Sequence, residues 1–220
     1  MKKIFFSLAM VAGFMTVNAQ TVVWSDDFND EDISDWTLYD EDGDGNEWLV
    51  VQIQDEDGNP VNTPVLRSFS WVSPLAVNPD NWAVSPAIDL TNYTGEIVLK
   101  WEVSAADASY SDENYSVYVA TSDQVADLAN SDVTFTELVT DNGPGGSVNF
   151  YEKTLDISSF SGEIVYVAFR HHDVSDEFSI EIDNVSVEAE SVMAVSDLNK
   201  NISSVYPNPV VDSFNVNLSS

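Results

Sequence analysis

The stretch EIVLKWEVS at residues 96–104 decides the fold. Its apolar residues alternate with charged ones, and one face of an extended chain carries Ile97, Leu99, Trp101 and Val103. Successive side chains of a strand point to opposite sides of a sheet, so a period of two is typical of a strand with one buried face. The stretch therefore predicts a strand whose apolar face covers a core.

The same alternation recurs from Val22 to about Glu188, for example in NYSVYVAT at 114–121 and EIVYVAFRHH at 163–172. Roughly ten such runs are separated by turn sequences rich in Gly, Pro, Asn and Asp. The helix candidate is SDQVADLAN at 122–130, which begins with a serine as its predicted cap. Many short strands with so little helix predict an all-β, jelly-roll-like antiparallel β-sandwich.

The charge balance limits the partners. The chain carries 38 Asp and Glu against 7 Lys and Arg, a formal net charge of -31. This excess of negative charge repels phosphate groups, so we expect no nucleic acid partner and no anionic membrane surface as a partner. There is no cysteine, which excludes thiol catalysis, zinc–thiolate sites and disulfide bonds.

Residues 1–19 have the features of a signal peptide. They contain Lys2 and Lys3, then an apolar run, then a small-residue cleavage site that ends at Ala19. We therefore expect a protein that is secreted or held at the outer cell surface, with no membrane insertion after processing. Residues 20–190 then form the sandwich, and the polar, aperiodic residues 191–203 form a linker.

Residues 204–220 begin a different element. They contain VYPNP and then an alternating strand, 214–218, which we expect to lack a partner. The run Tyr206, Pro207, Asn208 and Pro209 resembles the start of the C-terminal sorting domain of the type IX secretion system. The resemblance implies the type IX secretion machinery as a partner, with only the first part of that sorting domain present.

The stretch YDEDGDGNEW at residues 39–48 is the clearest candidate site. Asp40, Asp42 and Asp44 occupy alternate positions before Gly45. Calcium takes six to eight oxygen ligands from a flexible loop, which alternate acids on a tight turn supply. An EF-hand is excluded, because the chain lacks its bidentate acid at position 12 and its flanking helices. The alternatives left open are a calcium loop and a solvated acidic turn.

The last strand candidate, FSIEIDNVSV at residues 178–187, changes parity. Its apolar residues up to Ile182 share one face, whereas Val185 and Val187 take the opposite parity. Keeping all of them on the core side requires one extra residue, so the pattern predicts a β-bulge near Asp183. The alternative is a strand end at which the pairing stops.

A bulge re-aims the side chain that it carries. Here it would direct Asp183 toward the opening strand of the domain, near Asp26 and Asp27. These three acids join Asp40, Asp42 and Asp44 as candidate metal ligands.

The body of the chain, about residues 22–188, resembles the cleaved-adhesin or choice-of-anchor J family, relatives of the MAM-like jelly rolls in gingipain adhesin regions. The resemblance is carried by DDF at 26–28, DEDGDGNEW at 40–48, NWAVSPAIDL at 81–90, NYSVYVAT at 114–121, and VAFRHHD with FSIEIDNVSV between 167 and 187. It implies a sandwich that is stabilised by structural Ca2+ and serves adhesion or ligand binding. It also implies a terminal acid that helps to bind the metal, which matches Asp183.

The histidines and tryptophans have less specific patterns. His171 and His172 are adjacent in a predicted strand and point apart, so they cannot hold one ion together, and we expect packed or hydrogen-bonded side chains. Trp101 lies on an apolar stripe and is expected in the core. Core or loop packing is the expectation for the other five tryptophans, with a sugar-stacking platform as the alternative.

These patterns favour a secreted or cell-surface, calcium-stabilised module that binds an extracellular glycan or protein ligand. No G-x-S-x-G, H-E-x-x-H or P-loop sequence occurs, so we expect no enzymatic activity. Two alternatives remain. One is a secreted glycoside hydrolase that uses paired carboxylates, and the other is a spacer module of a larger secreted protein.

Overall fold

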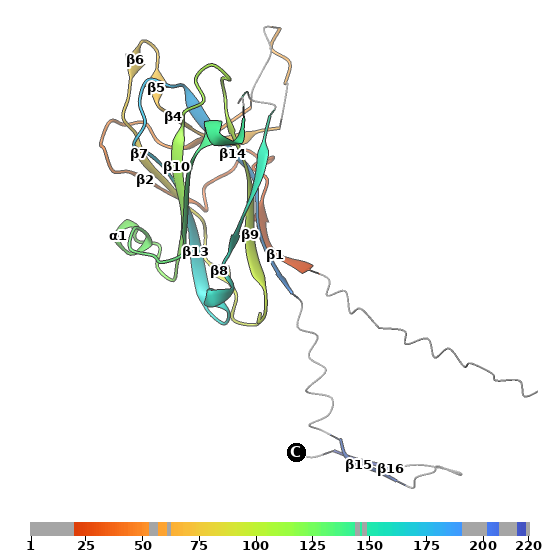
Figure 1. Cartoon of the computed structure of the whole chain (residues 1–220). Helices are drawn as coiled ribbons and strands as arrows, with labels where there is room; N and C mark the ends of the chain where they lie inside the picture. Colours follow the sequence, from red (N-terminus) through yellow and green to blue (C-terminus); the bar gives the residue numbers. More distant parts are fainter. Residues whose placement is uncertain are drawn as a thin grey trace, which may run out of the picture.

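The fold is a β-sandwich of two facing antiparallel sheets (Figure 1). The computed structural model describes residues 20–52, 57–60, 63–143, 146 and 149–190, together with the backbone of 202–206 and 215–218. Residues from both sheets contribute to one hydrophobic core. The all-β, jelly-roll-like antiparallel β-sandwich expected from the sequence is confirmed.

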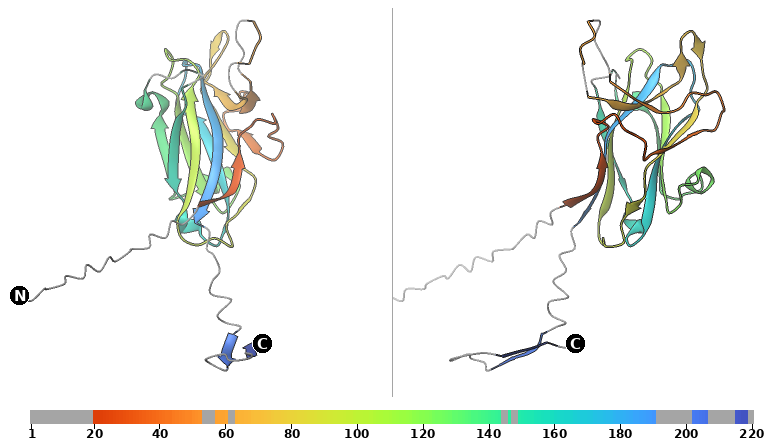
Figure 2. Two further views of the ribbon diagram at one scale, coloured as in Figure 1. Left: turned by 90° about the vertical axis from the view of Figure 1, so that its right-hand side faces the viewer. Right: turned by 180° about the vertical axis from the view of Figure 1, so that it is seen from behind.

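The first sheet has six strands in the order β12-β9-β14-β4-β3, with β1 also paired to β14. Their bounds are β1 Gln20–Asp26, β3 Leu49–Val51, β4 Val65–Phe69, β9 Ile97–Ala105, β12 Tyr151–Asp156 and β14 Ser179–Glu190. Gln20 pairs with Glu190, so the two ends of the sandwich chain leave from the same end of the molecule (Figure 2).

The second sheet also has six strands, in the order β11-β10-β13-β7-β2, with β8 paired to β13. Their bounds are β2 Thr37–Asp40, β7 Asp80–Val84, β8 Ile88–Asp89, β10 Asn114–Ala120, β11 Thr134–Leu138 and β13 Ile164–His172. A short hairpin of β5 Trp71–Val72 and β6 Leu75–Ala76 projects at the end of the sandwich opposite the entry of β1 (Figures 1 and 2).

Helices are short in the described part of the chain. They are α1 Val125–Leu128 and the 3-10 turns Val139–Asn142 and Ser158–Phe160. α1 confirms the helix expected within 122–130, but the serine cap was wrong, because the N-cap is Gln124. Ser122 lies two residues earlier, where its hydroxyl accepts from the Gln124 backbone N–H and donates to Asp127. No helix here is long and apolar enough to cross a bilayer.

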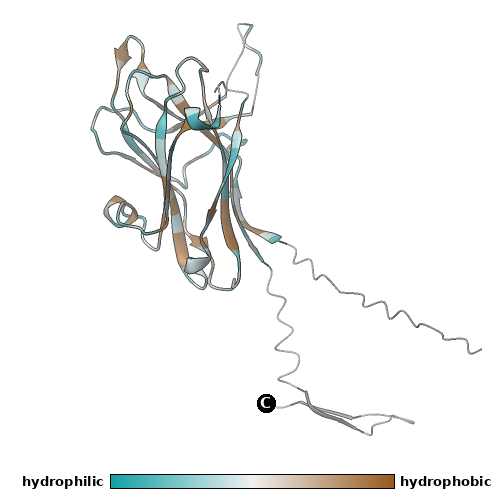
Figure 3. Cartoon of the chain, in the orientation of Figure 1, coloured by the Kyte–Doolittle hydropathy of each residue, from teal (hydrophilic) through white to brown (hydrophobic). Residues whose placement is uncertain are grey.

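The core confirms the strand from which the sequence argument began. Ile97, Leu99, Trp101 and Val103 are all fully buried. The intervening Lys100 points outward and pairs with a glutamate of the neighbouring β14. Figure 3 shows hydrophobic segments on strands of both facing sheets.

The parity change in the last strand is a bulge, as expected. The pairing of β14 with β9 shifts register between Asp183 and Ser186, and Asn184 takes a left-handed φ of 49°. The apolar residues on both sides of the shift, including Ile182 and Val185, are therefore buried. Phe178 departs from the pattern, since it precedes β14 and is half-buried against Phe69.

Several expectations from the sequence concern residues before and after the sandwich. The signal peptide at residues 1–19 lies outside the described residues, and so do most of the linker 191–203 and the run Pro207 to Pro209. The expectation that the strand near 214–218 lacks a partner was wrong, because β16 Asn215–Leu218 pairs with β15 Ile202–Tyr206. Two antiparallel strands that pair satisfy the backbone groups on the edge that they share.

The left-handed backbone at Asn184 gives a first test. Asn184→Gly should leave the free energy of unfolding within about 0.5 kcal/mol of the wild type, because glycine adopts a positive φ without steric cost. Asn184→Val should lower it by about 2 kcal/mol, because a β-branched residue is strained there. Urea unfolding measures both values. Equal stability of the two variants would show that the bulge does not impose this backbone.

Candidate functional site

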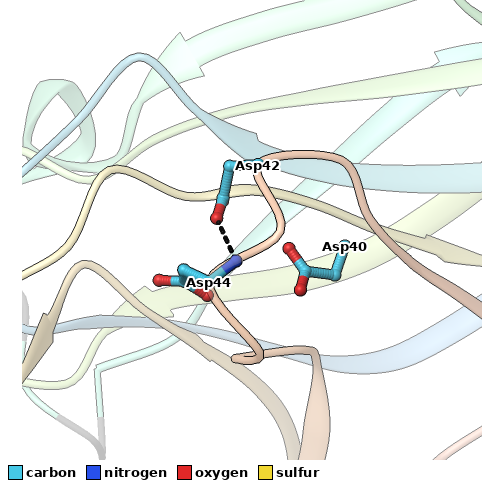
Figure 4. Close-up of side chains that lie close together, drawn as sticks. All are labelled: Asp40, Asp42 and Asp44. Carbon is cyan, nitrogen blue, oxygen red and sulfur yellow. Dashed lines mark hydrogen bonds between the residues drawn. The ribbon is translucent and has the colours of Figure 1, made fainter.

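Asp40 ends β2 of the second sheet, and Asp42 and Asp44 lie close to it on the loop that leads to β3 of the first sheet (Figure 4). One ligand oxygen from each carboxylate lies within 4.8 Å of those of the other two. The loop therefore brings three acidic groups to the point where the chain crosses between the sheets. The spacing of the sequence predicted this cluster.

Backbone hydrogen bonds shape the loop around Asp40. Its two carboxylate oxygens accept from the N–H groups of Gly43 at 2.7 Å and Gly45 at 2.8 Å. The bond from Gly45 is the main cause that lowers the pKa of Asp40 below its usual value. Both glycines have positive φ, 74° and 83°, which lets the turn be this tight.

Asp42 ties the loop to β7. Its carboxylate accepts from the backbone N–H of Asp80 at 2.6 Å and from that of Asp44 at 3.0 Å. Partial burial raises the pKa of Asp42, and repulsion from Asp44 and Asp40 raises it further. A cation between the three carboxylates would remove this repulsion. Three carboxylates are fewer than the six to eight oxygens of a calcium site, so water or carbonyl oxygens would complete it.

Asp183 occupies the bulge of β14 and is only 4% exposed. Its oxygens accept from the Asn184 N–H at 2.7 Å and from the Thr63 hydroxyl at 3.3 Å. Burial raises the pKa of Asp183 to about 6, and the carboxylates of Glu102 and Asp27 add to the rise. The bulge thus brings Asp183 close enough to Asp27 for the two groups to repel, as the parity argument predicted.

Asp26 and Asp27 end β1 and start the loop that follows it. Asp26 accepts from the Phe28 N–H and from the Trp36 indole N–H, both at 2.8 Å, and burial raises its pKa. Asp27 is exposed, and hydrogen bonds from Asn29 lower its pKa. Within the described residues, only Asp40, Asp42 and Asp44 form a group of three close ligands. The six candidates therefore divide into a compact trio, the pair Asp183 and Asp27, and Asp26, which is bonded to Trp36.

The two histidines are buried and hydrogen-bonded, as expected. His171 Nδ1 lies 2.9 Å from Ser68 Oγ, and its Nε2 lies 2.8 Å from a Glu113 oxygen. This serine–histidine–carboxylate chain has the residue types of a nucleophilic triad. All three residues are fully buried, so no substrate reaches them. Their role is a polar cross-link between β4 of the first sheet and β13 of the second.

Glu113 was not singled out by any sequence pattern, yet it organises one end of the sandwich. Besides His171, its carboxylate accepts from the Ser70 hydroxyl and from the backbone N–H of Phe178, both at 2.9 Å. A buried carboxylate with this many donors fixes the segments that carry them. Glu113 therefore holds the residues before β5 and before β14 at one position.

The tryptophans mainly confirm the core expectation. Trp36, Trp48, Trp82 and Trp101 are buried, and Trp24 packs on Trp36 with ring centroids 5.9 Å apart. Trp71 is the exception. It is half-buried at the end of the molecule and lines two neighbouring hollows. Its partners come from distant segments, so no sequence spacing pointed to this place.

The architecture defines the protein class as a jelly-roll-like β-sandwich with acidic loops at the sheet crossings. Residues 21–187 match the family described as Cleaved Adhesin Domain, and the chain belongs to this family. The resemblance to the cleaved-adhesin family noted in the sequence is therefore confirmed.

Relatives in Porphyromonas gingivalis are much longer proteins. Hemagglutinin A is 27% identical over 188 residues, which are 78% of this chain and 8% of the relative. Gingipain R1 is 31% identical over 179 residues, which are 77% of this chain and 10% of the relative. The chain thus spans about a tenth or less of the length of these curated relatives.

A solved structure of the same family has the same fold. The K3 cleaved adhesin domain of Lys-gingipain from Porphyromonas gingivalis W83 superposes with a TM-score of 0.61 at 29% identity. The match covers 77% of this chain and 99% of that domain. The K1 domain of the same protein gives a TM-score of 0.60 at 27% identity, with 78% and 98% covered.

The raised pKa of Asp183 gives a second test. A folded-state pKa of about 6, above the usual 3.8, means that the native state binds the proton more tightly. This contribution to stability is complete below pH 3.8 and is lost as the pH rises through 6. In chelator at pH 7.5, Asp183→Asn should therefore raise the free energy of unfolding by about 1 kcal/mol.

Urea unfolding at pH 4.5 and pH 7.5 measures the effect, and the advantage of the variant should shrink at the lower pH. Asp89→Asn is the matched control. A hydrogen bond from the Thr91 hydroxyl lowers the pKa of Asp89, so its replacement should destabilise the protein at pH 7.5. If Asp183→Asn in chelator at pH 7.5 is less stable than the wild type, the argument that burying this charge lowers stability is contradicted.

Proposed function

We propose that this chain is an extracellular, non-enzymatic adhesion module that binds a glycan or protein ligand and is stabilised by calcium. Membership of the cleaved adhesin family supports an adhesion role. The matches to hemagglutinin A and gingipain R1 each cover one segment of a longer protein, which is typical of a module. The signal peptide and the type IX sorting segment, both inferred from the sequence, support an extracellular location and the type IX machinery as a partner.

The observation that carries the calcium proposal is the convergence of Asp40, Asp42 and Asp44. Calcium is a hard cation that prefers carboxylate oxygens on a flexible loop, and this loop offers three. An ion here would offset the mutual repulsion of the carboxylates and stiffen the crossing between the sheets. Asp42 would transmit the effect to β7 through its bond to Asp80. Asp183, Asp26 and Asp27 are candidates for a second calcium position at the bulge.

The hydrolase alternative has weaker support. A glycosidase needs an accessible carboxylic acid with a raised pKa that faces a second carboxylate across the substrate. Asp183 has a raised pKa, but it is nearly buried and accepts hydrogen bonds at both oxygens. The geometry therefore favours a structural charge over a proton donor.

Thermal unfolding tests the calcium proposal. With calcium at about 100 times its Kd, the free energy of unfolding should rise by about 2.7 kcal/mol relative to chelator. For a chain of this size, this corresponds to a rise in Tm of about 5–10 °C. Asp44→Asn should reduce the rise, since it removes one carboxylate and leaves an oxygen to accept the Asn46 N–H. Asp89→Asn should leave the calcium-dependent rise unchanged.

Coincident melting curves with calcium and with chelator would falsify the calcium proposal. The same rise with magnesium in place of calcium would contradict the selectivity argued from the loop, because magnesium demands a small, regular octahedral site.

A binding screen separates the three functional alternatives. The purified chain is applied to a glycan array and to immobilised extracellular proteins, and each retained glycan is then assayed for cleavage. Retention without turnover supports the module. Turnover that is lost on replacing one carboxylate supports the hydrolase, and retention on no surface supports the spacer.

A further inference from the structure

An aromatic corner lies beside the β5–β6 hairpin. Trp71 and Phe178 have ring centroids 6.3 Å apart and planes inclined by 61°, an edge-to-face contact, and both residues line one hollow. Tyr110 forms a third side and is 51% exposed. The hollow has a volume of about 340 Å³. We call these three residues the aromatic corner.

Hydrogen bonds hold the walls in place. The backbone N–H groups of Ser70 and Trp71 both donate to the Phe178 carbonyl, at 3.1 and 3.3 Å. The Asp176 N–H donates to the Ser70 carbonyl at 3.1 Å. The buried carboxylate of Glu113 accepts from the Ser70 hydroxyl and from the Phe178 backbone N–H. A site with walls fixed in this way loses little conformational entropy when a ligand binds.

Three carboxylates complete the lining, from Asp107, Asp176 and Glu177. Asp107 sits in the same tight turn as Tyr110, whose N–H donates to the Asp107 carbonyl at 3.1 Å. Asp176 has a φ of 61°, so its side chain leaves the backbone from a left-handed position. Burial raises the pKa of Glu177, and neighbouring carboxylates, Asp176 among them, raise it further. Negative charge is therefore concentrated at the aromatic corner.

The described part of the chain offers this charge no internal partner among its basic residues. Its lysines and arginines are engaged elsewhere, in the pairs Arg67–Glu181, Lys100–Glu188, Lys153–Glu137 and Arg170–Asp80. None of them lines the hollow. Both histidines also have carboxylate partners of their own, Glu113 and Asp173. A ligand that neutralises the hollow must therefore bring its own positive charge.

We propose that the aromatic corner binds an arginine side chain of a partner protein. The guanidinium would stack against Trp71 and Phe178 and pair with the carboxylates of Asp107, Asp176 and Glu177. A planar cation is attracted to the faces of aromatic rings, and its N–H fork fits carboxylates. A neutral sugar would also cover the rings, but it would bring no positive charge to the three carboxylates. Among the described residues, these carboxylates have only backbone N–H donors, from Ser109 to Asp107 and from Asp112 to Glu177. Charge complementarity therefore favours the cation.

The surroundings suit a protein partner. On the other side of Trp71 and Phe178 lies a second hollow of about 530 Å³, which Phe69 and Leu49 also line. Leu49 is 42% exposed, and Leu75 of the hairpin is 66% exposed. These residues provide apolar contact next to the charged hollow, the arrangement of an anchor with a surrounding rim. The proposal rests on the proposed function as a binding module, but it does not depend on calcium.

The test uses the full chain and a capped peptide with one central arginine flanked by glycine and serine. The matched probe replaces arginine by citrulline, which keeps the shape and removes the charge. Titration followed by NMR gives the affinities. The arginine peptide should bind at least tenfold more tightly than the citrulline peptide. Trp71→Ala and Asp176→Asn should each weaken arginine binding by about tenfold, and asparagine tolerates the left-handed backbone of position 176.

Two further variants serve as controls. Tyr110→Ala removes a side chain that is half exposed, so it keeps the proposal testable if Trp71→Ala fails to fold, and it should also weaken binding. Glu163→Gln removes one exposed charge next to the opposite end of β13 and should leave the affinity within twofold. The arginine peptide could bind more tightly than the citrulline peptide while Trp71→Ala leaves the arginine affinity unchanged. This result would reveal general attraction to an acidic protein and would overturn the proposal.

Other outcomes separate this proposal from the proposed function. Equal binding of the two peptides overturns the arginine site, and so does a glycan that binds at Trp71 while the arginine peptide does not. If Trp71→Ala and Tyr110→Ala both leave ligand retention unchanged, the proposed function as a binding module stands and the aromatic corner is overturned as its binding site. If arginine binding persists in chelator and the melting curves with calcium and with chelator coincide, the calcium proposal is overturned and the arginine site stands.

Discussion

The structure depends on the pairing of strand β14. On one side this strand pairs with β9, and on the other it pairs first with β4 and then with β1. Its partner changes at the bulge, which lets the apolar residues on both sides face one core and places Asp183 near Asp27. The residues just before the strand hold Phe178 beside Trp71. The acidic bulge and the aromatic corner are therefore both positioned by one strand.

A buried polar network makes the end of the sandwich rigid. Ser68 and His171 join the two sheets, and Glu113 connects them to the segments before β5 and β14. A buried carboxylate is costly unless hydrogen-bond donors surround it, and Glu113 has three. The same bonds that satisfy it also fix the walls of the aromatic corner. Stability of the core and the shape of the surface hollow are thus properties of one network.

The strong negative charge has different consequences in different parts of the structure. The lysines and arginines of the described sandwich are engaged in ion pairs with four of its acids, so the remaining acids have no Lys or Arg partner there. Around Asp40 the acids accept backbone hydrogen bonds, which stabilise the loop and keep the carboxylates close together. At the aromatic corner the acids line one hollow together with aromatic rings. The first arrangement suits a metal ion, and the second suits an organic cation, because ring faces attract cations that shed water readily.

Local patterns were sufficient to predict the strands, the bulge near Asp183 and the acidic loop at Asp40, because alternation, parity and D-x-D-x-D spacing depend on neighbours in the chain. The serine cap was wrong, since the competing turn at Ser122 depends on backbone geometry. The aromatic corner and the Glu113 network draw residues from near 70, 110 and 177, which meet only through long-range strand pairing. Sequence periodicity carries no information about which strands pair, so only the tertiary structure could reveal these sites.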